Sequence, residues 1–173
     1  MKVTFIGGGT MAEALVSRLV SRGSATRDDI DVVDPVEARR ELLRGQYKIR
    51  VHETPSACIA GADVVVLAVK PQDLLKVVPQ VGRLGATQLL LSILAGVKLE
   101  TLASSFSHGL IARAMPNTPA QIGMGMTVWT ALSSVDESNL GRARAILSAL
   151  GEEIYVADEK YVDMATAVSG SGP

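Results

Sequence analysis

Short apolar runs alternate with longer amphipathic stretches along the first half of the chain. The runs at residues 2–6, 30–33 and 63–69 are rich in valine and isoleucine, and each is followed within two residues by glycine or proline. Apolar residues at helical spacing between these runs predict helices over residues 10–22 and 36–44, the second ending at Gly45. The unbroken run at 63–69 predicts a strand that is buried on both faces, as in a parallel sheet.

The same alternation continues to the end of the chain. Further strands are predicted at residues 49–51, 88–93, 110–114, 126–130 and 153–156. Helices are predicted at 71–81, with a break at Pro79, at 98–105, and at 136–150 ahead of Gly151; others are expected to start around Pro55 and from Glu159 onwards. Strands and helices in this order predict an α/β fold with a doubly wound, mostly parallel sheet.

The composition supports this fold class and argues against nucleic-acid and membrane partners. The 173 residues are 47% hydrophobic with only 3% aromatic side chains and 16 glycines, which suits an α/β domain better than a β-sandwich. With 17 basic and 18 acidic residues the net charge is −1, so we expect no nucleic-acid partner. The longest uncharged stretch, residues 114–135, is interrupted by prolines and glycines, so we expect no membrane partner either.

Metal-binding and thiol chemistry also find little support. Cys58 is the single cysteine, which excludes an intrachain disulfide and a zinc site built on cysteines. The two histidines, His52 and His108, fit no zinc-binding pattern, so we expect no metal site. The N-terminus lacks the plan of a signal peptide, and a reducing, cytoplasmic setting is the expectation that follows.

The turn after the first predicted strand carries the clearest candidate chemistry. Residues 6–12 read Ile-Gly-Gly-Gly-Thr-Met-Ala and fit the pattern G-x-G-x-x-G/A between a strand and a helix, the context of a Rossmann-type dinucleotide site. Gly7 permits the tight turn, Gly9 lets the backbone approach a pyrophosphate, and Ala12 lets the helix pack closely on the strand. The alternative is a plain turn without a ligand, which would not require three glycines and their entropic cost.

The end of the second predicted strand is where such folds contact the adenosine ribose. Asp34 stands there and can accept hydrogen bonds from both ribose hydroxyls, while its charge would repel a 2′-phosphate; this favours NAD. Arg39 and Arg40 in the following helix could instead turn toward a phosphate. Asp34 could also be only a turn residue before Pro35.

Other loops are expected at the same edge of the sheet, because ligands of doubly wound folds lie over the carboxyl ends of the strands. Lys70 could contact the cofactor or attract an anion, or be an exposed lysine at a helix start. The small Ala95 could admit a nicotinamide ring, and the Asn117 amide could bond the carboxamide or ribose; both could equally be turn residues.

Several motifs along the chain resemble those of pyrroline-5-carboxylate reductases. They are residues 6–15 (IGGGTMAEAL), 68–71 (AVKP), 92–97 (SILAGV), 113–120 (RAMPNTPA) and 168–173 (VSGSGP). The resemblance implies hydride transfer from NADPH or NADH to 1-pyrroline-5-carboxylate, giving L-proline, in proline biosynthesis. It also implies a dinucleotide-binding domain like the N-terminal domain of 6-phosphogluconate dehydrogenase, followed by a helical domain through which a homo-oligomer forms.

The resemblance indicates which residues hold the cofactor. The expected contacts are Gly7, Gly9, Thr10, Met11, Asp34, Val69, Lys70, Pro71, Ala95 and Asn117. Residues 1–157 would form the dinucleotide-binding domain and 158–173 would begin the helical domain. The family's substrate contacts and its Thr or Ser acid lie in the helical domain, beyond Pro173, so no catalytic residue is assigned, and we expect a truncated chain that binds the cofactor without turnover. One departure is Pro55, which stands where many members have an asparagine.

Two other functions are compatible with the glycine turn. One is another reductase of the same superfamily, acting with a deazaflavin or on a 2-hydroxy acid, against which residues 114–120 argue. The other is a dinucleotide-binding module without catalysis.

Overall fold

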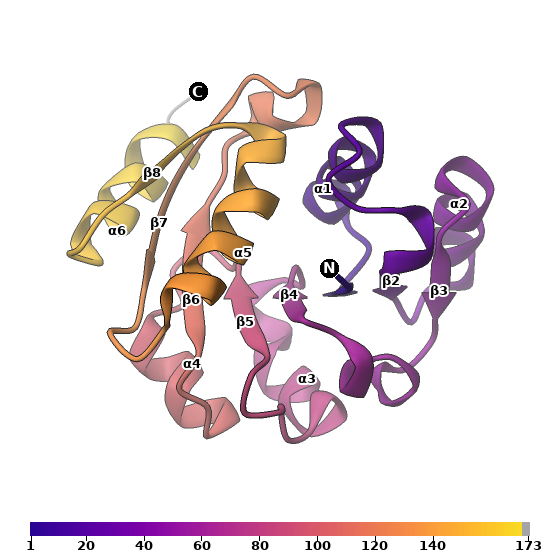
Figure 1. Cartoon of the computed structure of the whole chain (residues 1–173), viewed down its shortest axis with the longest axis horizontal. Coiled ribbons are helices and arrows are strands. Elements are labelled where there is room, and N and C mark those ends of the chain that lie inside the picture. Colours follow the sequence, from indigo (N-terminus) through magenta and orange to yellow (C-terminus); the bar gives the residue numbers. More distant parts are fainter. Residues whose placement is uncertain (171–173) are drawn as a thin grey trace.

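The apolar runs form strands whose side chains are buried on both faces, and the amphipathic stretches form the helices that cover them (Figure 1). The computed structural model describes residues 1–170. Its strands are β1 (Val3–Ile6), β2 (Ile30–Val33), β3 (Arg50–His52), β4 (Val64–Leu67), β5 (Leu89–Ser92), β6 (Ile111–Met115), β7 (Gly125–Ala131) and β8 (Gly151–Tyr155). Its helices are α1 (Thr10–Ser21), α2 (Glu37–Tyr47), α3 (Leu74–Val81), α4 (Leu99–Phe106), α5 (Glu137–Leu147) and α6 (Lys160–Ala165).

All eight strands belong to one sheet in the order β3-β2-β1-β4-β5-β6-β7-β8. The strands from β3 to β6 pair in parallel, β7 runs antiparallel to β6, and β8 is parallel to β7. The chain winds outward from β1 on one side and from β4 on the other, which is the doubly wound arrangement. The predicted fold class is therefore confirmed.

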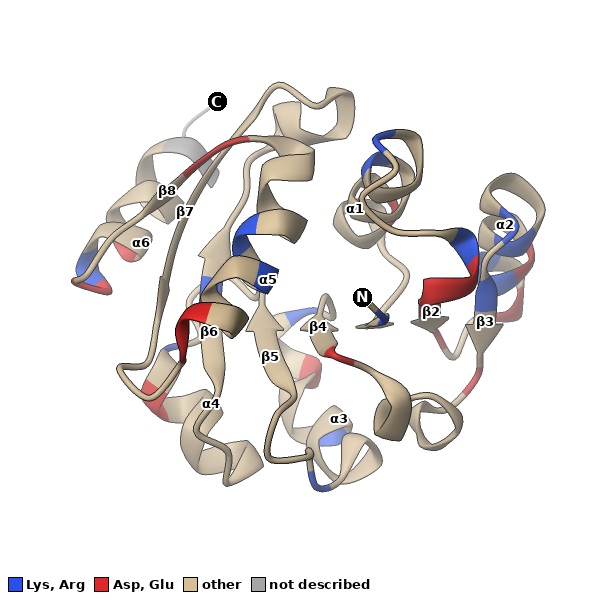
Figure 2. Cartoon of the chain, viewed as in Figure 1, with Lys and Arg blue, Asp and Glu red and all other residues tan. Residues whose placement is uncertain are grey.

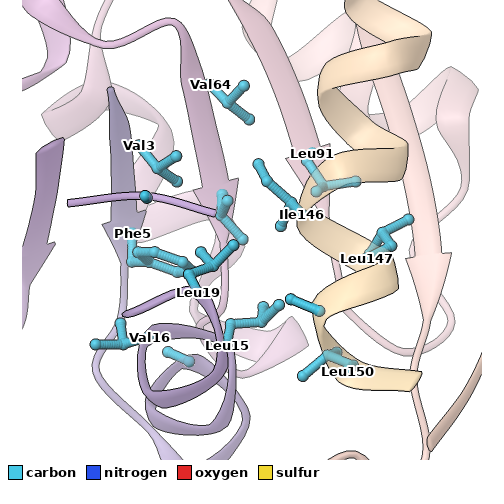
Figure 3. Packing of buried hydrophobic residues seen from close by; sticks show 14 of the residues in the cluster. Val3, Phe5, Leu15, Val16, Leu19, Val64, Leu91, Ile146, Leu147 and Leu150 are labelled. Atoms are coloured by element: carbon cyan, nitrogen blue, oxygen red, sulfur yellow. The ribbon is translucent and has the colours of Figure 1, made fainter. Parts of the chain in front are cut away.

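Helices cover both faces of the sheet. On one face α1, α2 and α5 pack over a core that includes Phe5, Leu15 and Ile146, all fully buried (Figure 3). On the other face α3 and α4 pack over a second core around Val65, Leu90 and Leu102. Burial of each such side chain contributes about 1.5–3 kcal/mol, so the two cores hold the strand ends in fixed positions. Within residues 1–170, no helix is long and apolar enough to cross a membrane.

Two predicted helices differ from the structure between β2 and β4. The helix expected to end at Gly45 continues to Tyr47, and Lys48 ends it in the left-handed conformation at φ 56°. A single glycine inside a helix costs only about 1 kcal/mol, less than the burial of Leu43 contributes. The helix expected from Pro55 is replaced by two three-residue 3₁₀ turns, because Cys58 between them, at φ −132° and ψ −13°, is not helical.

Two further predictions need correction at helix ends. Pro79 lies inside α3 and does not break it. A proline has no N–H to donate to the Leu75 carbonyl, but Leu75 is 79% exposed, so water can donate to this carbonyl instead. The helix predicted over 136–150 ends as α-helix at Leu147, and a 3₁₀ turn completes it (Ser148–Leu150).

The last helix, α6, is fastened to the sheet by a buried charge. Arg113 of β6 is 1% exposed and donates to Glu159 Oε1 at 2.7 Å and to Asp163 Oδ1 at 2.6 Å. Glu159 Oε1 also accepts from the Leu99 backbone N–H, at 2.8 Å. The predicted helix from Glu159 onwards thus packs on the sheet, while residues 171–173 of the expected helical domain lie outside the described residues.

Candidate functional site

A cleft of about 440 Å³ lies over the carboxyl ends of β1, β2 and β4. Gly7 follows β1, Asp34 follows β2 and Val69 follows β4, and all three line the cleft. This is the point at which the strand order reverses, where open α/β sheets bind their ligands. The sheet topology therefore brings together loops that are up to 62 positions apart in the sequence, counted from Gly7 to Val69.

The glycine turn forms the floor of this cleft, and its first and third glycines serve different purposes. Gly7 has φ +100°, and a Cβ built on it would lie 2.7 Å from the Ala68 carbonyl oxygen at the end of β4. Gly9 has an ordinary φ of −64°, and a Cβ built there meets no atom within 4 Å among the described residues. Gly7 is therefore required by the turn itself, whereas Gly9 keeps open a space that the folded chain does not fill.

Helix α1 begins directly after this open space. Its first turn has no side-chain cap among the described residues, and the Gly9 carbonyl accepts from the Glu13 N–H at 2.9 Å. The first backbone N–H groups of a helix have no partner inside the helix, and the helix dipole makes this end favourable for anions. The N-terminus of α1 at the cleft can therefore hold a phosphate group.

Asp34 lies half-buried in the cleft wall with both carboxylate oxygens bonded to the backbone. Oδ2 accepts from Gly8 N–H at 2.9 Å, and Oδ1 accepts from Val36 N–H at 2.9 Å. The side chain thus joins the end of β2 to the glycine turn, which supports its interpretation as a turn residue. A carboxylate offers about four acceptor positions, so it can still accept bonds from a ligand's hydroxyls.

Arg39 and Arg40, two of the three arginines of α2, are held by acidic side chains. Arg39 donates to the Gly8 carbonyl and forms an ion pair with Glu13 at 2.5 Å. Arg40, which is buried, donates to the Asp34 carbonyl at 2.7 Å and pairs with Glu37. Figure 2 shows basic and acidic residues intermixed along the ribbon of α2.

The opposite wall of the cleft comes from the segment between β4 and α3. Of the predicted residues, Val69 and Lys70 line it, whereas the exposed Pro71 begins the 3₁₀ turn after Lys70 and lies just outside the lining. Lys76 and Gln80 of α3 also line the cleft and were not predicted. Their spacing of four residues on a helix that follows a central strand is the signal that could have identified them.

Thr10 and Met11 do not line the cleft with the others. Thr10 opens a neighbouring hollow of about 240 Å³ that also contains Glu13 and Tyr47. The Met11 side chain is partly buried and packs against the core beneath α1. Both residues belong to the first turn of α1, whose backbone N–H groups have no partner inside the helix.

Ala95 and Asn117 lie farther along the same edge, after β5 and β6. Ala95 is exposed, and the next residue, Gly96, turns the chain with φ +73°. The half-buried Asn117 accepts from the Met126 backbone N–H at 2.9 Å through Oδ1, so part of its side chain holds the loop before β7. The five predicted residues in the cleft are thus Gly7, Gly9, Asp34, Val69 and Lys70.

Two other features lie away from this edge. A hollow of about 990 Å³ lies at the amino ends of β4, β5 and β6, near Asp63, Gln88 and Leu110. Ligands of parallel sheets lie at the carboxyl ends, so the smaller cleft is the candidate site. Cys58 is half-buried, and burial raises the pKa of its thiol to about 11, which suits a packing residue rather than a nucleophile. Among the described residues, no three metal-binding side chains cluster.

Comparisons with known proteins agree with this geometry. The chain is 40% identical to a pyrroline-5-carboxylate reductase of Synechocystis over 173 residues, covering 100% of this chain and 64% of that protein. It is 36% identical to the enzyme of that name from Pseudomonas aeruginosa, covering 99% of the chain and 63% of that protein. The chain thus spans slightly less than two thirds of the length of these curated relatives, and the predicted resemblance to them is confirmed.

Solved structures share the fold. A pyrroline-5-carboxylate reductase from Coxiella burnetii has a TM-score of 0.92 at 31% identity, covering 99% of this chain and 64% of that one. The Plasmodium falciparum pyrroline carboxylate reductase with NADP bound has a TM-score of 0.87 at 24% identity, covering 100% and 63%. Residues 2–96 match the family model described as NADP oxidoreductase, coenzyme F420-dependent. Since that match takes in more than half of its residues, the chain belongs to the family of coenzyme F420-dependent NADP oxidoreductases.

Proposed function

We propose that the chain binds NADH or NADPH in the cleft over β1, β2 and β4. The observation that carries this proposal is the open space at Gly9 next to the uncapped start of α1. A pyrophosphate fits such a space because it needs close backbone approach and free N–H donors. Asp34 would accept from the adenosine ribose, and Ala95 and Asn117 would lie along the edge toward the nicotinamide.

The protein to which the chain belongs is proposed to be a pyrroline-5-carboxylate reductase. Support comes from two curated relatives of that name at 36–40% identity along 99–100% of this chain. The bound nicotinamide would supply a hydride to the imine carbon of 1-pyrroline-5-carboxylate, giving L-proline. The chain's own residues would orient the cofactor and exclude water, the two contributions that hydride transfer needs most from a protein.

The remaining parts of the proposal concern domains and assembly. Residues 1–157 are proposed as the dinucleotide-binding domain and 158–173 as the start of a helical domain. Tyr161 and Met164 of α6 are 46% and 57% exposed, which supports a further packing partner on this side. We also propose that the protein is cytoplasmic and forms a homo-oligomer through that helical domain.

A fluorescence titration of the purified chain with NADH and with NADPH tests the binding proposal. Saturable binding of at least one nucleotide is expected, and binding of neither would overturn it. The reaction is tested separately by the oxidation of NAD(P)H that depends on added 1-pyrroline-5-carboxylate, with L-proline identified as the product. We expect the chain alone to bind without turnover and a full-length homologous protein to catalyse; failure of the full-length protein would overturn the substrate assignment.

A second candidate is hydride exchange between NADP and a deazaflavin. The family description, which names coenzyme F420, favours it. The same full-length protein incubated with reduced F420 and NADP would distinguish the two, because reduction of NADP without any imine is expected only of the second function.

A further inference from the structure

We propose that the adenosine end of the cleft selects NADH over NADPH, and that Glu13 enforces this selection by holding Arg39 away from the cleft. The inference rests on the proposed binding of a dinucleotide. It adds a specificity-determining role to a helix residue that does not line the cleft.

The cleft presents negative charge where a 2′-phosphate would bind. Asp34 at the end of β2 is fixed by its bonds to Gly8 N–H and Val36 N–H, each 2.9 Å, so it cannot rotate away without breaking both. Glu53 lines the same cleft, is largely exposed, and has its Oε2 4.0 Å from Nη2 of the buried Arg40. A carboxylate fixed here accepts from ribose hydroxyls and repels a phosphate at the same position.

An arginine close to the end of β2 is the usual means of accepting the 2′-phosphate, and Arg39 stands in a suitable place in the sequence. Its guanidinium, however, already has two partners outside the lining of the cleft. Nε donates to the Gly8 carbonyl, and Nη2 pairs with Glu13 Oε2 at 2.5 Å. No arginine is among the described residues that line the cleft.

Glu13 is itself held firmly in this position. Its other oxygen, Oε1, accepts from the Tyr47 hydroxyl at 2.9 Å, so α1 and the end of α2 are joined through one carboxylate. The Arg39 and Glu13 side chains are 23% and 25% exposed, which shields their bond from water. Arg40 is equally committed, to Glu37 and to the Asp34 carbonyl.

Two lysines line the cleft on the wall opposite Asp34. Lys76 is paired with Asp73, which also lines the cleft, at 3.0 Å, and Lys70 precedes the 3₁₀ turn of residues 71–73. They come from the β4–α3 segment and not from the β2–α2 segment beside the ribose site. We therefore expect the carboxylate of Asp34, and not these lysines, to decide the preference between NADH and NADPH.

The test compares the dissociation constants of NADH and NADPH for the chain and three variants. The unchanged chain is expected to bind NADH at least about tenfold more tightly, the factor that one charged hydrogen bond contributes. Glu13→Gln frees Arg39 while the amide oxygen can still accept from Tyr47, and it is expected to tighten NADPH binding selectively. Glu41→Gln removes the same charge from an exposed position of α2 and is expected to leave the ratio unchanged.

Arg39→Ala provides the check that does not depend on Glu13→Gln folding well. Because Arg39 is withheld in the unchanged chain, its removal is expected to leave the NADH-to-NADPH ratio as it was. A fall in NADPH affinity alone would show that Arg39 already reaches the phosphate. That result, or equal binding of both nucleotides by the unchanged chain, or a folded Glu13→Gln variant with an unaltered ratio, would overturn this inference. Binding of neither nucleotide would instead overturn the proposed function.

Discussion

A methyl group added to the glycine turn should have opposite consequences at its two key positions. Gly7→Ala places a Cβ 2.7 Å from the Ala68 carbonyl oxygen and forces an L-residue to φ +100°. The unfavourable backbone conformation costs about 1–3 kcal/mol, and relief of the close contact costs about 1–3 kcal/mol more. A loss of about 2–6 kcal/mol is a large part of the 5–15 kcal/mol by which domains are usually stable.

Gly9→Ala should leave the fold almost unchanged. Its φ is ordinary and its added methyl meets no described atom within 4 Å. Reduced entropy of the unfolded chain stabilises by about 0.4–1 kcal/mol, and alanine is a poorer N-cap than glycine by a similar amount. The methyl group would nevertheless fill the space proposed for the pyrophosphate, so nucleotide binding should weaken at least about tenfold, the loss of one charged hydrogen bond.

Urea unfolding followed by the fluorescence of Trp129, the single and fully buried tryptophan, gives the stabilities, and titration with NADH or NADPH gives the affinities. Gly45→Ala serves as the control, because this glycine lies inside α2 with open space around it and its replacement should stabilise by about 0.5–1 kcal/mol. Equal stability of the Gly7 and Gly9 variants would refute the steric argument. A Gly9 variant that binds nucleotide normally would refute the assignment of its open space to a ligand.

Three further outcomes are expected. Burial raises the pKa of Asp31, but hydrogen bonds with Arg50 and His52 outweigh burial and hold this pKa below its ordinary value of 3.8. The ionised Asp31 should therefore add to the free energy of unfolding in full above about pH 4, and this contribution should be lost as the pH falls through the pKa of the folded state. In Asp31→Asn this part of the pH dependence of urea unfolding should disappear. The Cys58 thiol, with a pKa of about 11, should react slowly with a disulfide reagent at neutral pH until urea unfolds the chain, and fast reaction in the folded state would contradict its burial. Replacing Glu159 and Asp163, the two carboxylates that bind Arg113, by amides should lower the free energy of unfolding in urea by about 3–5 kcal/mol. This loss should exceed that of Arg113→Met, because the arginine stays buried whereas the carboxylates can be hydrated; the reverse order would refute this reasoning.

The strands and the glycine turn could be predicted because their determinants are local. An apolar run such as residues 64–67 is buried on both faces wherever it lies in a parallel sheet, and a run of three glycines marks a tight turn, which here requires glycine at Gly7. Helix ends were predicted less well. Gly45 and Pro79 signal an end, yet packing of the surrounding apolar residues outweighs costs of a few kcal/mol.

The hydrogen bonds and ion pairs of the side chains could not be predicted in the same way, since they depend on neighbours that are distant in sequence. Asp34 was rightly placed at the end of β2, but its bond to Gly8 joins residues 26 positions apart. The pairing of Arg39 with Glu13 spans the same distance and argues against the alternative that this arginine turns toward a phosphate. Sequence patterns thus determine which loops reach the carboxyl edge of the sheet, because the carboxyl ends of parallel strands lie at the same edge whatever the strand order. Which charges remain available there is settled only when α1 packs beside α2, because an ion pair requires two side chains at contact distance.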